Sequence, residues 1–376
     1  MQSAVSPVEP PSPDAVALVC RQFLGGQDFR QQPLAGRGWS GSPIYRVDSA
    51  LGGWVLKRFP PAATPARAAW VHRLMQQVRA GGVAAVPNVL PLAADSHKGR
   101  MTVAVDREGS LWEMVEFKPG SPVEQPSLPQ VCAGMRTLAL LHRAAAAGAE
   151  DGDLCRAHLR GPSPGQQRRV EKAKRLLADP WSGWQERISR GTPLQEAVAQ
   201  RLERATGLWR TFRMEQALAV VAATPAAEIG LQPVLSDVWS DHILFGGEDK
   251  AAAVSGVIDY HAAGIDNPAA DIARLLGSWH LGGALWQVSG AGRLVDRFGE
   301  ALAAYQEIGC LAPEEIASIS GFHATAVVFG IDHWFRWTLL DGASFQAPAA
   351  VVARIDHLLQ LLPEALETIL QGGNRG

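Results

Sequence analysis

One stretch decides the fold, and it reads Leu235-Ser236-Asp237-Val238-Trp239-Ser240-Asp241-His242-Ile243-Leu244-Phe245. A second apolar segment, Val254 to Ile258, follows a Gly-containing turn at 246 to 250, which predicts a β-hairpin. Asp237 and His242 lie on the entry to this hairpin, and Asp259 follows its second strand. Two carboxylates and an imidazole placed in this way can converge on one point, as phosphoryl transfer from a nucleotide requires.

The stretch resembles the catalytic core of the aminoglycoside phosphotransferase and choline kinase family. That family has His-Gly-Asp-x-x-x-x-Asn-Ile-Leu, then Ile-Asp-Phe or Ile-Asp-Tyr, then Asp-Pro-x-x-Asp-Leu-Ala. The positions that match are Asp237, Ile243, Leu244, Ile258, Asp259, Pro268, Asp271 and Ala273. Three positions depart from the pattern, because Leu235 replaces His, Ser236 replaces Gly and His242 replaces the metal-binding Asn.

The resemblance implies a two-lobed, protein-kinase-like α+β fold, and 376 residues provide ample core for two lobes. We expect a disordered lead at 1–12 and a small antiparallel-sheet N-lobe at 13–116. A large helical C-lobe should follow at 117–376, with the catalytic loop at 235–245 and a metal-binding segment at 257–271.

A glycine-rich segment precedes two predicted strands. It reads Gly36-Arg37-Gly38-Trp39-Ser40-Gly41-Ser42, a Gly-x-Gly-x-x-Gly pattern that alone has little specificity. A dinucleotide-binding unit would continue into a helix, whereas here strands follow at 42–47 and 54–59, as in kinases. We therefore expect the nucleotide phosphates to contact Gly36, Gly38, Ser40, Gly41, Ser42 and Lys57.

The next helix, predicted from Thr64 to Arg79, occupies the position of the kinase helix that carries an acid to pair with the lysine. Thr64 is a suitable cap and Pro65 a suitable first residue, but the helix contains no acid. Lys57 must therefore find its anion in Asp259, in Glu113 or in the nucleotide.

Two further strands are predicted at 101–105 and 111–115, and the chain then reaches the expected junction between the lobes. In the family this segment holds the adenine. The resemblance therefore implies that the backbone at 113–116, with Glu113 and Val115, binds the base.

The remaining sequence is mainly helical. Leu128 to Ala147 predicts one helix, with His142 buried in a structural role, and 162–225 predicts two or three amphipathic helices. Four more helices are expected at about 269–282, 288–307, 313–340 and 347–372. The chain has 12 Trp residues, of which one or two could line an acceptor pocket.

Composition argues against several classes of partner. The formal net charge is −2, which gives no strong field for nucleic acid or for an anionic membrane. The Pro- and Ser-rich N-terminus lacks the pattern of a signal peptide, and the 4 Cys residues form no Cys-x-x-Cys. We expect a cytoplasmic protein with no nucleic-acid or membrane partner, whose oligomeric state is open.

The first functional hypothesis is a small-molecule kinase that uses ATP and Mg²⁺, with Mn²⁺ as an alternative ion. Asp237 would orient or deprotonate a hydroxyl of the acceptor, while Asp259 and His242 would bind the metal. Asp271 would hydrogen-bond the catalytic loop. The acceptor is open among aminoglycosides, amino alcohols, sugars and homoserine-like alcohols.

The second hypothesis is a catalytically degenerate protein of the same fold that binds a nucleotide or has a regulatory role. The missing helix acid, Leu235 and His242 favour it, whereas Asp237 and Asp259 argue against it. A protein-serine kinase is less well supported, because the segment from Asp259 to Asp271 is too short to present a peptide.

Overall fold

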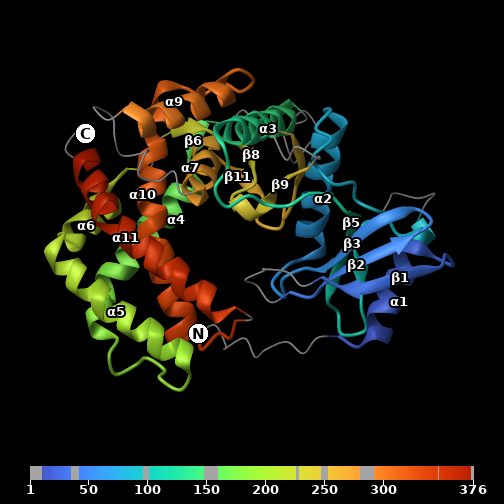
Figure 1. Ribbon diagram of the computed structural model, residues 1–376, viewed down its shortest axis with the longest axis horizontal. Helices are drawn as coiled ribbons and strands as arrows, with labels where there is room; N and C mark the ends of the chain where they lie inside the picture. The colour runs from blue at the N-terminus through green and yellow to red at the C-terminus, as the bar shows by residue number, and fades with distance from the viewer. Residues whose placement is uncertain are drawn as a thin grey trace.

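The computed structural model describes residues 11–34, 42–95, 101–147, 160–225, 228–246, 253–279, 292–345 and 347–373. It has two lobes, a small one built on an antiparallel sheet and a large helical one (Figure 1). The α+β, kinase-like prediction is therefore confirmed. The expected disordered lead at 1–12 lies almost wholly outside the described residues, and the lobe boundary at 116–117 stays a prediction.

The small lobe is a five-stranded antiparallel sheet in the order β1-β2-β3-β5-β4. Its strands are β1 (Phe29–Pro33), β2 (Ile44–Ser49), β3 (Gly52–Arg58), β4 (Ala104–Val105) and β5 (Leu111–Glu116). Helix α1 (Pro13–Leu24) packs on this sheet through Val16, Val19 and Phe23. The register places Lys57 of β3 opposite Glu113 of β5.

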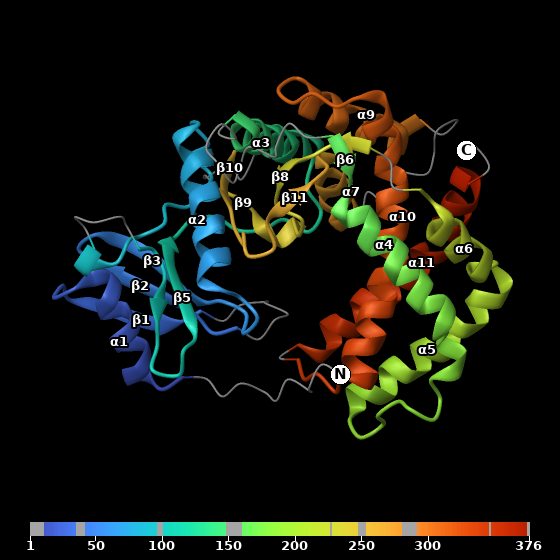
Figure 2. The same ribbon diagram turned by 180° about the vertical axis from the view of Figure 1, so that it is seen from behind.

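Helix α2 (Pro65–Ala80) lies between the sheet and the helical lobe (Figures 1 and 2). Thr64 caps it by accepting a hydrogen bond from the Arg67 amide at 3.2 Å. Its apolar face belongs to the core of the large lobe rather than to the core of the sheet. Gln77 adds two hydrogen bonds, to the carbonyls of Ala144 and Ala145 at the end of α3 (Leu128–Ala147). The helix is therefore fixed to the larger lobe.

The large lobe contains mainly helices, with three short antiparallel strand pairs around the candidate site. After α3 its elements are β6 (Arg160–Pro162), α4 (Pro164–Ala178), η3 (Trp181–Gly183), α5 (Pro193–Thr211), α6 (Met214–Ala223), β7 (Glu228–Gly230), β8 (Gln232–Val234), η4 (Ser240–His242), β9 (Ile243–Phe245), β10 (Val254–Val257), β11 (Gly264–Asp266), α7 (Pro268–Ser278), α9 (Gly292–Gln306), α10 (Pro313–Phe335) and α11 (Pro348–Gly373). The predicted hairpin is the β9–β10 pair, and the predicted 162–225 region forms three helices.

Two apolar cores hold this lobe together. The first joins α2, α3, the β9–β10 hairpin, α7 and α9, and the second joins α4, α5, α6, α10 and α11. The predicted helix at 313–340 differs in its last turn, because α10 ends at Phe335 and a π-helical turn covers Arg336–Leu340. Such turns occur mostly as single turns and often near functional sites. None of the helices in the described ranges is long and apolar enough to cross a membrane.

Candidate active site

The predicted catalytic loop, 235–245, leaves β8 through a strained turn. Ser236 has φ of +62°, a left-handed conformation that a side chain adopts only at a cost. The carboxylate of Asp271 holds this turn, accepting hydrogen bonds from the amides of Leu235 at 2.7 Å and Ser236 at 2.8 Å. The turn is thus maintained although a Ser occupies a position where Gly would meet no strain.

The side chain of Asp271 is itself held in place by His142. It lies in the first turn of α7 with 0% of its surface exposed, and His142 Nε2 lies 3.1 Å from its Oδ2. His142 Nδ1 lies 2.8 Å from the hydroxyl of Tyr305 on α9. Burial raises the pKa of Tyr305, and the charge of Asp271 raises it further. His142 is thus buried, and it connects the catalytic-loop support to two helices of the core.

Asp237 is oriented by two donors that sequence reasoning missed. The indole Nε1 of Trp239 donates to Asp237 Oδ1 at 2.8 Å, and the guanidinium of Arg274 donates to the same oxygen at 2.9 Å. The Asp237 side chain is 46% exposed, and no hydrogen bond to its Oδ2 is found within the described residues. That second oxygen can therefore accept a hydrogen bond from a hydroxyl that enters the site.

The sequence contains a signal for these donors. Arg274 follows Asp271 by three residues on α7, so the two side chains leave neighbouring positions of one helix face. Trp239 lies two residues beyond Asp237, within reach of its own loop.

Lys57 connects the two lobes at Asp259. Its Nζ lies 2.7 Å from Asp259 Oδ1, and the Lys57 side chain is 13% exposed. Burial would raise the pKa of Asp259, but the charges of Lys57, His242 and His261 lower it below its usual value. Asp259 also has a left-handed backbone, with φ of +65°, directly after β10. Strain of this kind is concentrated at functional sites.

His242 lies on the other side of Asp259. Its Nε2 is 3.9 Å from Asp259 Oδ2, and its carbonyl accepts a hydrogen bond from the amide of Ile258 at 2.9 Å. Adjacent ligands of an octahedral Mg²⁺ lie about 3 Å apart, given metal–oxygen distances of about 2.1 Å. A small side-chain movement would therefore bring both atoms onto one ion. The buried Nδ1 of His242 has no hydrogen-bond partner among the described residues, so nothing there fixes the ring.

The residues in this region fit a metal only with help from a ligand. No group of three or more His, Cys, Asp or Glu side chains in the described ranges is placed to hold an ion by itself. Mg²⁺ commonly takes one or two protein carboxylates and completes its shell with phosphates and water. Asp259 and His242 therefore fit a site that a nucleotide would complete.

Glu113 is occupied by two histidines. Its carboxylate lies 2.8 Å from His72 Nε2 on α2 and 2.7 Å from His261 Nε2. Burial would raise the pKa of Glu113, but these two imidazoles hold it well below its usual range. Phe59 stacks on His261 with ring centroids 4.3 Å apart. A histidine on α2 thus pairs with an acid on β5, while the lysine of β3 pairs with Asp259.

The structure describes only some of the residues that were predicted to bind the nucleotide. Gly36, Gly38, Ser40 and Gly41 lie outside the described residues, and Ser42 is described, two residues before β2. Within the predicted adenine segment the Glu116 amide donates to Asn88 and the Met114 carbonyl accepts from Leu90. Those groups already have protein partners, and the adenine contact of Glu113 and Val115 stays a prediction.

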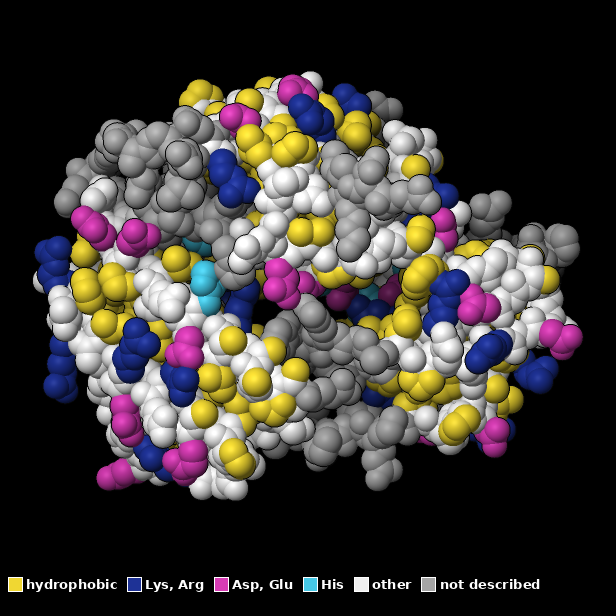
Figure 3. Space-filling model, viewed as in Figure 1, with side chains coloured by type: hydrophobic (Ala, Val, Ile, Leu, Met, Phe, Trp, Pro, Cys, Tyr) yellow, Lys and Arg dark blue, Asp and Glu magenta, His cyan; other side chains and the backbone are white. Residues whose placement is uncertain are grey.

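A cavity of about 420 Å³ lies next to the catalytic loop. Its walls are formed by Arg67, Arg168, Ser236, Asp237, Ala262, Ala263, Gly264 and Ile265. In the space-filling view, basic, acidic and histidine side chains gather around the hollow in the middle of the molecule (Figure 3). Asp237 is therefore open to a molecule that enters this cavity.

Comparison with known proteins agrees with this geometry. Residues 31–312 match the sequence model of the phosphotransferase enzyme family. None of the curated proteins matches the chain.

Solved structures with the same fold include three phosphotransferases. An aminoglycoside phosphotransferase from Alicyclobacillus acidocaldarius is 15% identical, covers 98% of both chains and has a TM-score of 0.54. The amicoumacin kinase hAmiN, in complex with AMP-PNP, Ca²⁺ and Ami, is 12% identical over 94% of both chains, with a TM-score of 0.59. The spectinomycin phosphotransferase APH(9)-Ia, with ADP and spectinomycin, is 10% identical over 94% of this chain and 98% of its own, with a TM-score of 0.62. Because the sequence identities are this low, the structural similarity shows the shared fold alone.

Proposed function

We propose, from the premise that this chain belongs to the phosphotransferase enzyme family, that it is a small-molecule kinase that transfers the γ-phosphate of ATP to a hydroxyl group. One observation carries the proposal. Lys57 of the sheet lobe contacts Asp259 of the helical lobe at 2.7 Å, beside the loop that Asp271 holds and that carries Asp237. A phosphate-binding cation, a metal-binding acid and a hydroxyl-orienting acid are the parts that phosphoryl transfer requires.

Each residue of the site would have a separate role in phosphoryl transfer. Asp237, held through Oδ1 by Trp239 and Arg274, would accept a hydrogen bond from the acceptor hydroxyl through Oδ2 and take its proton during transfer. Lys57 would leave Asp259 in part and bind the nucleotide phosphates. Asp259 and His242 would hold a divalent ion, which when bound neutralises the charge on the transferring phosphate.

The neighbours support the choice of nucleotide and ion. The amicoumacin kinase structure contains AMP-PNP and Ca²⁺, and the spectinomycin phosphotransferase structure contains ADP. ATP with Mg²⁺, or with Mn²⁺ because of the imidazole, follows for this chain as part of the proposal.

A degenerate nucleotide-binding protein is the alternative, and a specific observation favours it. Helix α2 contains no acid to pair with Lys57, and His242, whose buried Nδ1 has no partner in the described part of the chain, stands where the family has a metal-binding Asn. A protein of this kind would bind ATP without transferring its phosphate.

The test is a screen of small alcohols for acceptor-dependent ATP consumption, with Asp237→Asn as the blank. Asp237→Asn should fold normally, since its side chain is half exposed, and should lose about two to four orders of magnitude in rate. If no alcohol is consumed and ATP with Mg²⁺ still raises the melting temperature of both proteins equally, the degenerate alternative replaces the kinase.

A further inference from the structure

The cavity beside Asp237 has a cationic wall. Arg67 from α2 and Arg168 from α4 both line it. Arg67 donates to the carbonyls of His261 and Ala263, which place its guanidinium at the segment that follows Asp259. Arg168 lies 3.3 Å from the buried Asp266. Of these two arginines only Arg168 has a carboxylate partner within the described residues.

Helix α4 extends this cationic surface. Arg168, Lys172 and Arg175 follow one another at spacings of four and three residues, so they share a face, and Arg169 lies beside them. Arg169 donates to the hydroxyl of Thr325 on α10 at 2.9 Å, and its guanidinium lies 4.6 Å from the Phe322 ring centroid. Arg168 and Arg175 pair with Asp266 and Asp332, whereas Lys172 between them has no carboxylate within ion-pair distance among the described residues.

A second set of cations surrounds Trp239. Arg274 of α7 and Arg354 of α11 both stack on its ring, with guanidinium carbons 4.9 Å and 4.4 Å from the ring centroid. Arg274 forms an ion pair with Asp237 at 2.9 Å. Arg354 has no carboxylate within ion-pair distance in the part of the chain that the structure describes.

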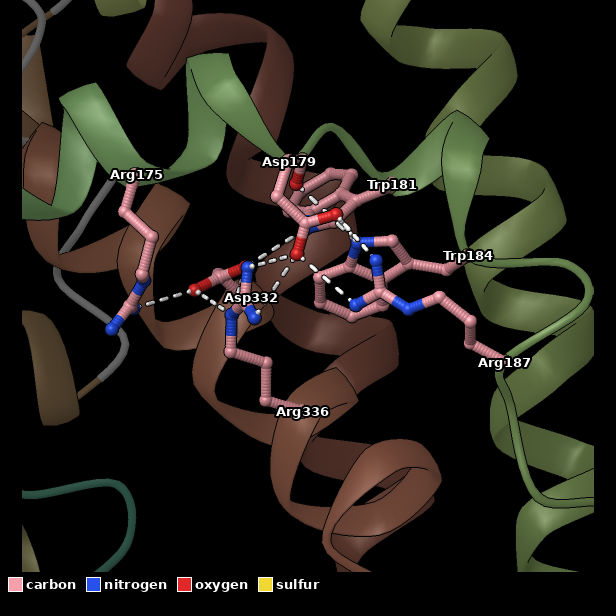
Figure 4. Close-up of polar contacts among 7 residues, drawn as sticks. All are labelled: Arg175, Asp179, Trp181, Trp184, Arg187, Asp332 and Arg336. Atoms are coloured by element: carbon pink, nitrogen blue, oxygen red, sulfur yellow. Dashed lines mark hydrogen bonds and ion pairs between the residues drawn. The ribbon is translucent and has the colours of Figure 1, made fainter. Parts of the chain in front are cut away.

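Two carboxylates of the helical lobe already pair with other arginines. Asp332 is contacted by Arg175, Trp181 and Arg336, and Asp179 by Trp184, Arg187 and Arg336 (Figure 4). These two acids therefore account for Arg175, Arg187 and Arg336. Among the described residues, no carboxylate lies within ion-pair distance of Arg67, Arg169, Lys172 or Arg354.

The titration behaviour of these groups agrees with such an imbalance. Burial lowers the pKa of Arg169 to about 10, and the charges of Arg274 and Arg168 add to the lowering while Asp266 opposes it. The pKa of Lys172 is also lowered, by desolvation of its ammonium group and by the charges of Arg169, Arg274 and Arg175, while Asp332 opposes the shift. Burial and Arg274 act against the charged form of Arg354, which Asp241 and Asp237 support. An anion bound among these groups would relieve their mutual repulsion.

We propose that the acceptor alcohol carries an anionic group, a carboxylate or a phosphate, which binds at the cavity wall formed by Arg67 and Arg168, with Lys172 one turn along the same face of α4, while its hydroxyl meets Asp237. The inference rests on the proposed kinase function and narrows its acceptor. Guanidinium groups bind carboxylate and phosphate oxygens through paired, charge-assisted hydrogen bonds. A polycationic acceptor would meet like charges here, so the cavity selects against it.

Binding is measured first, on the full-length protein saturated with AMP-PNP and Mg²⁺ so that the nucleotide site is filled. Calorimetric titrations use citrate as a carboxylate probe, inorganic phosphate as a phosphate probe and kanamycin as a polycationic probe. Citrate or phosphate should bind and kanamycin should not. The stronger of the two anions identifies the chemical source of the anionic group.

The variants locate the site. Lys172→Gln should weaken anion binding by about tenfold, as expected for the loss of one charge-assisted contact. Lys174→Gln is the matched control, because Lys172 and Lys174 are both exposed on α4, lie about half a turn apart and so face different directions, and give the same change in net charge. Equal anion affinity in the two variants, or no anion binding in the wild type, would overturn the inference.

Turnover gives an independent readout. Glucose, glucosamine, glucuronate and glucose 6-phosphate share one ring and differ in the charge of one group. Phosphorylation confined to the anionic members supports the inference. Phosphorylation of glucose or glucosamine in preference to both anions would overturn the inference and leave the kinase function standing. Anion binding that depends on Lys172 in a protein that never binds AMP-PNP would support the anion site and contradict the kinase function.

Discussion

Arg274 donates to Asp237 Oδ1 at 2.9 Å while its guanidinium carbon lies 4.9 Å from the centre of the Trp239 ring. The indole of the same Trp239 donates to the same oxygen at 2.8 Å. Asp237, Trp239 and Arg274 thus form a closed set of contacts in which each residue touches the other two. The orientation of the candidate base depends on this set, because the Asp237 side chain is otherwise half exposed.

Arg274→Ala should therefore lower kcat by about tenfold to a hundredfold, the equivalent of one hydrogen bond to a charged group. KM for ATP should stay unchanged, because Arg274 contacts Asp237 and not the Lys57–Asp259 pair. Steady-state kinetics against Arg204→Ala, an exposed arginine on α5, provide the comparison. A variant with wild-type kcat would mean that Trp239 alone orients Asp237.

Asp271→Ala should destabilise the protein as well as inactivate it. The substitution leaves the amides of Leu235 and Ser236 without their acceptor and removes the partner of His142, all in a buried place. Each unsatisfied buried group costs about 1–3 kcal/mol, so the free energy of unfolding should fall by at least about 2 kcal/mol in urea titrations. Asp271→Asn, which keeps an acceptor oxygen, should lose less. Unfolding curves identical to wild type would show that the loop holds its turn without this carboxylate.

His242→Asn should shift metal preference. An imidazole suits transition metals, whereas an amide oxygen suits Mg²⁺, so wild-type activity with Mn²⁺ relative to Mg²⁺ should exceed that of the variant. The Nε2 of His242 lies 3.9 Å from Asp259 Oδ2, which makes a shared ion geometrically reasonable. Activity is titrated with both metals at saturating ATP. The same Mn²⁺ to Mg²⁺ ratio in both proteins would remove His242 from the ligand set.

The protein should lose stability as the pH falls from about 6.5 to about 4, in part through His323. Burial of His323 against Gly277 lowers its pKa from 6.5 to about 4, with His357 and Arg354 adding to the shift and the Ala273 backbone opposing it. Because the unfolded chain binds this proton first, the stabilising effect is complete above the unfolded pKa and disappears as the pH falls toward the folded one. The loss should amount to roughly 3 kcal/mol at 1.36 kcal/mol per unit of pKa. The free energy of unfolding of His323→Gln should change less with pH over this range. An equal dependence on pH in the variant and the wild type would contradict the assignment.

Local patterns predicted the elements well. Thr64 with Pro65 located the start of α2, and the apolar periodicity of 128–147 gave α3 its observed bounds. These signals lie within a few residues of the structure they specify. The strands β1, β6, β7, β8 and β11 were not predicted, because none of them contains the apolar run or the apolar–polar alternation that marks a strand, whereas the equally short β9 is apolar throughout.

The candidate site was predicted where one segment carries it. Asp237, His242, Asp259 and Asp271 come from a single stretch, so their spacing could be read directly. The pairing of His72 with Glu113 joins a helix to a strand 41 residues away, and no pattern in the sequence around either residue predicts this contact. The cations around Trp239 come from α7 and α11 and required the structure for the same reason.

The burial of α2 has a consequence for regulation. Its Val71, Leu74, Met75 and Val78 are between 0% and 2% exposed, within the core of the large lobe. Exposing a buried side chain of this size costs about 1.5–3 kcal/mol, so swinging the helix outward would cost roughly 6–12 kcal/mol. That is comparable to the whole stability of a typical domain. Displacing this helix is therefore out of reach as an on–off switch, so α2 should keep its place whether or not a ligand is bound.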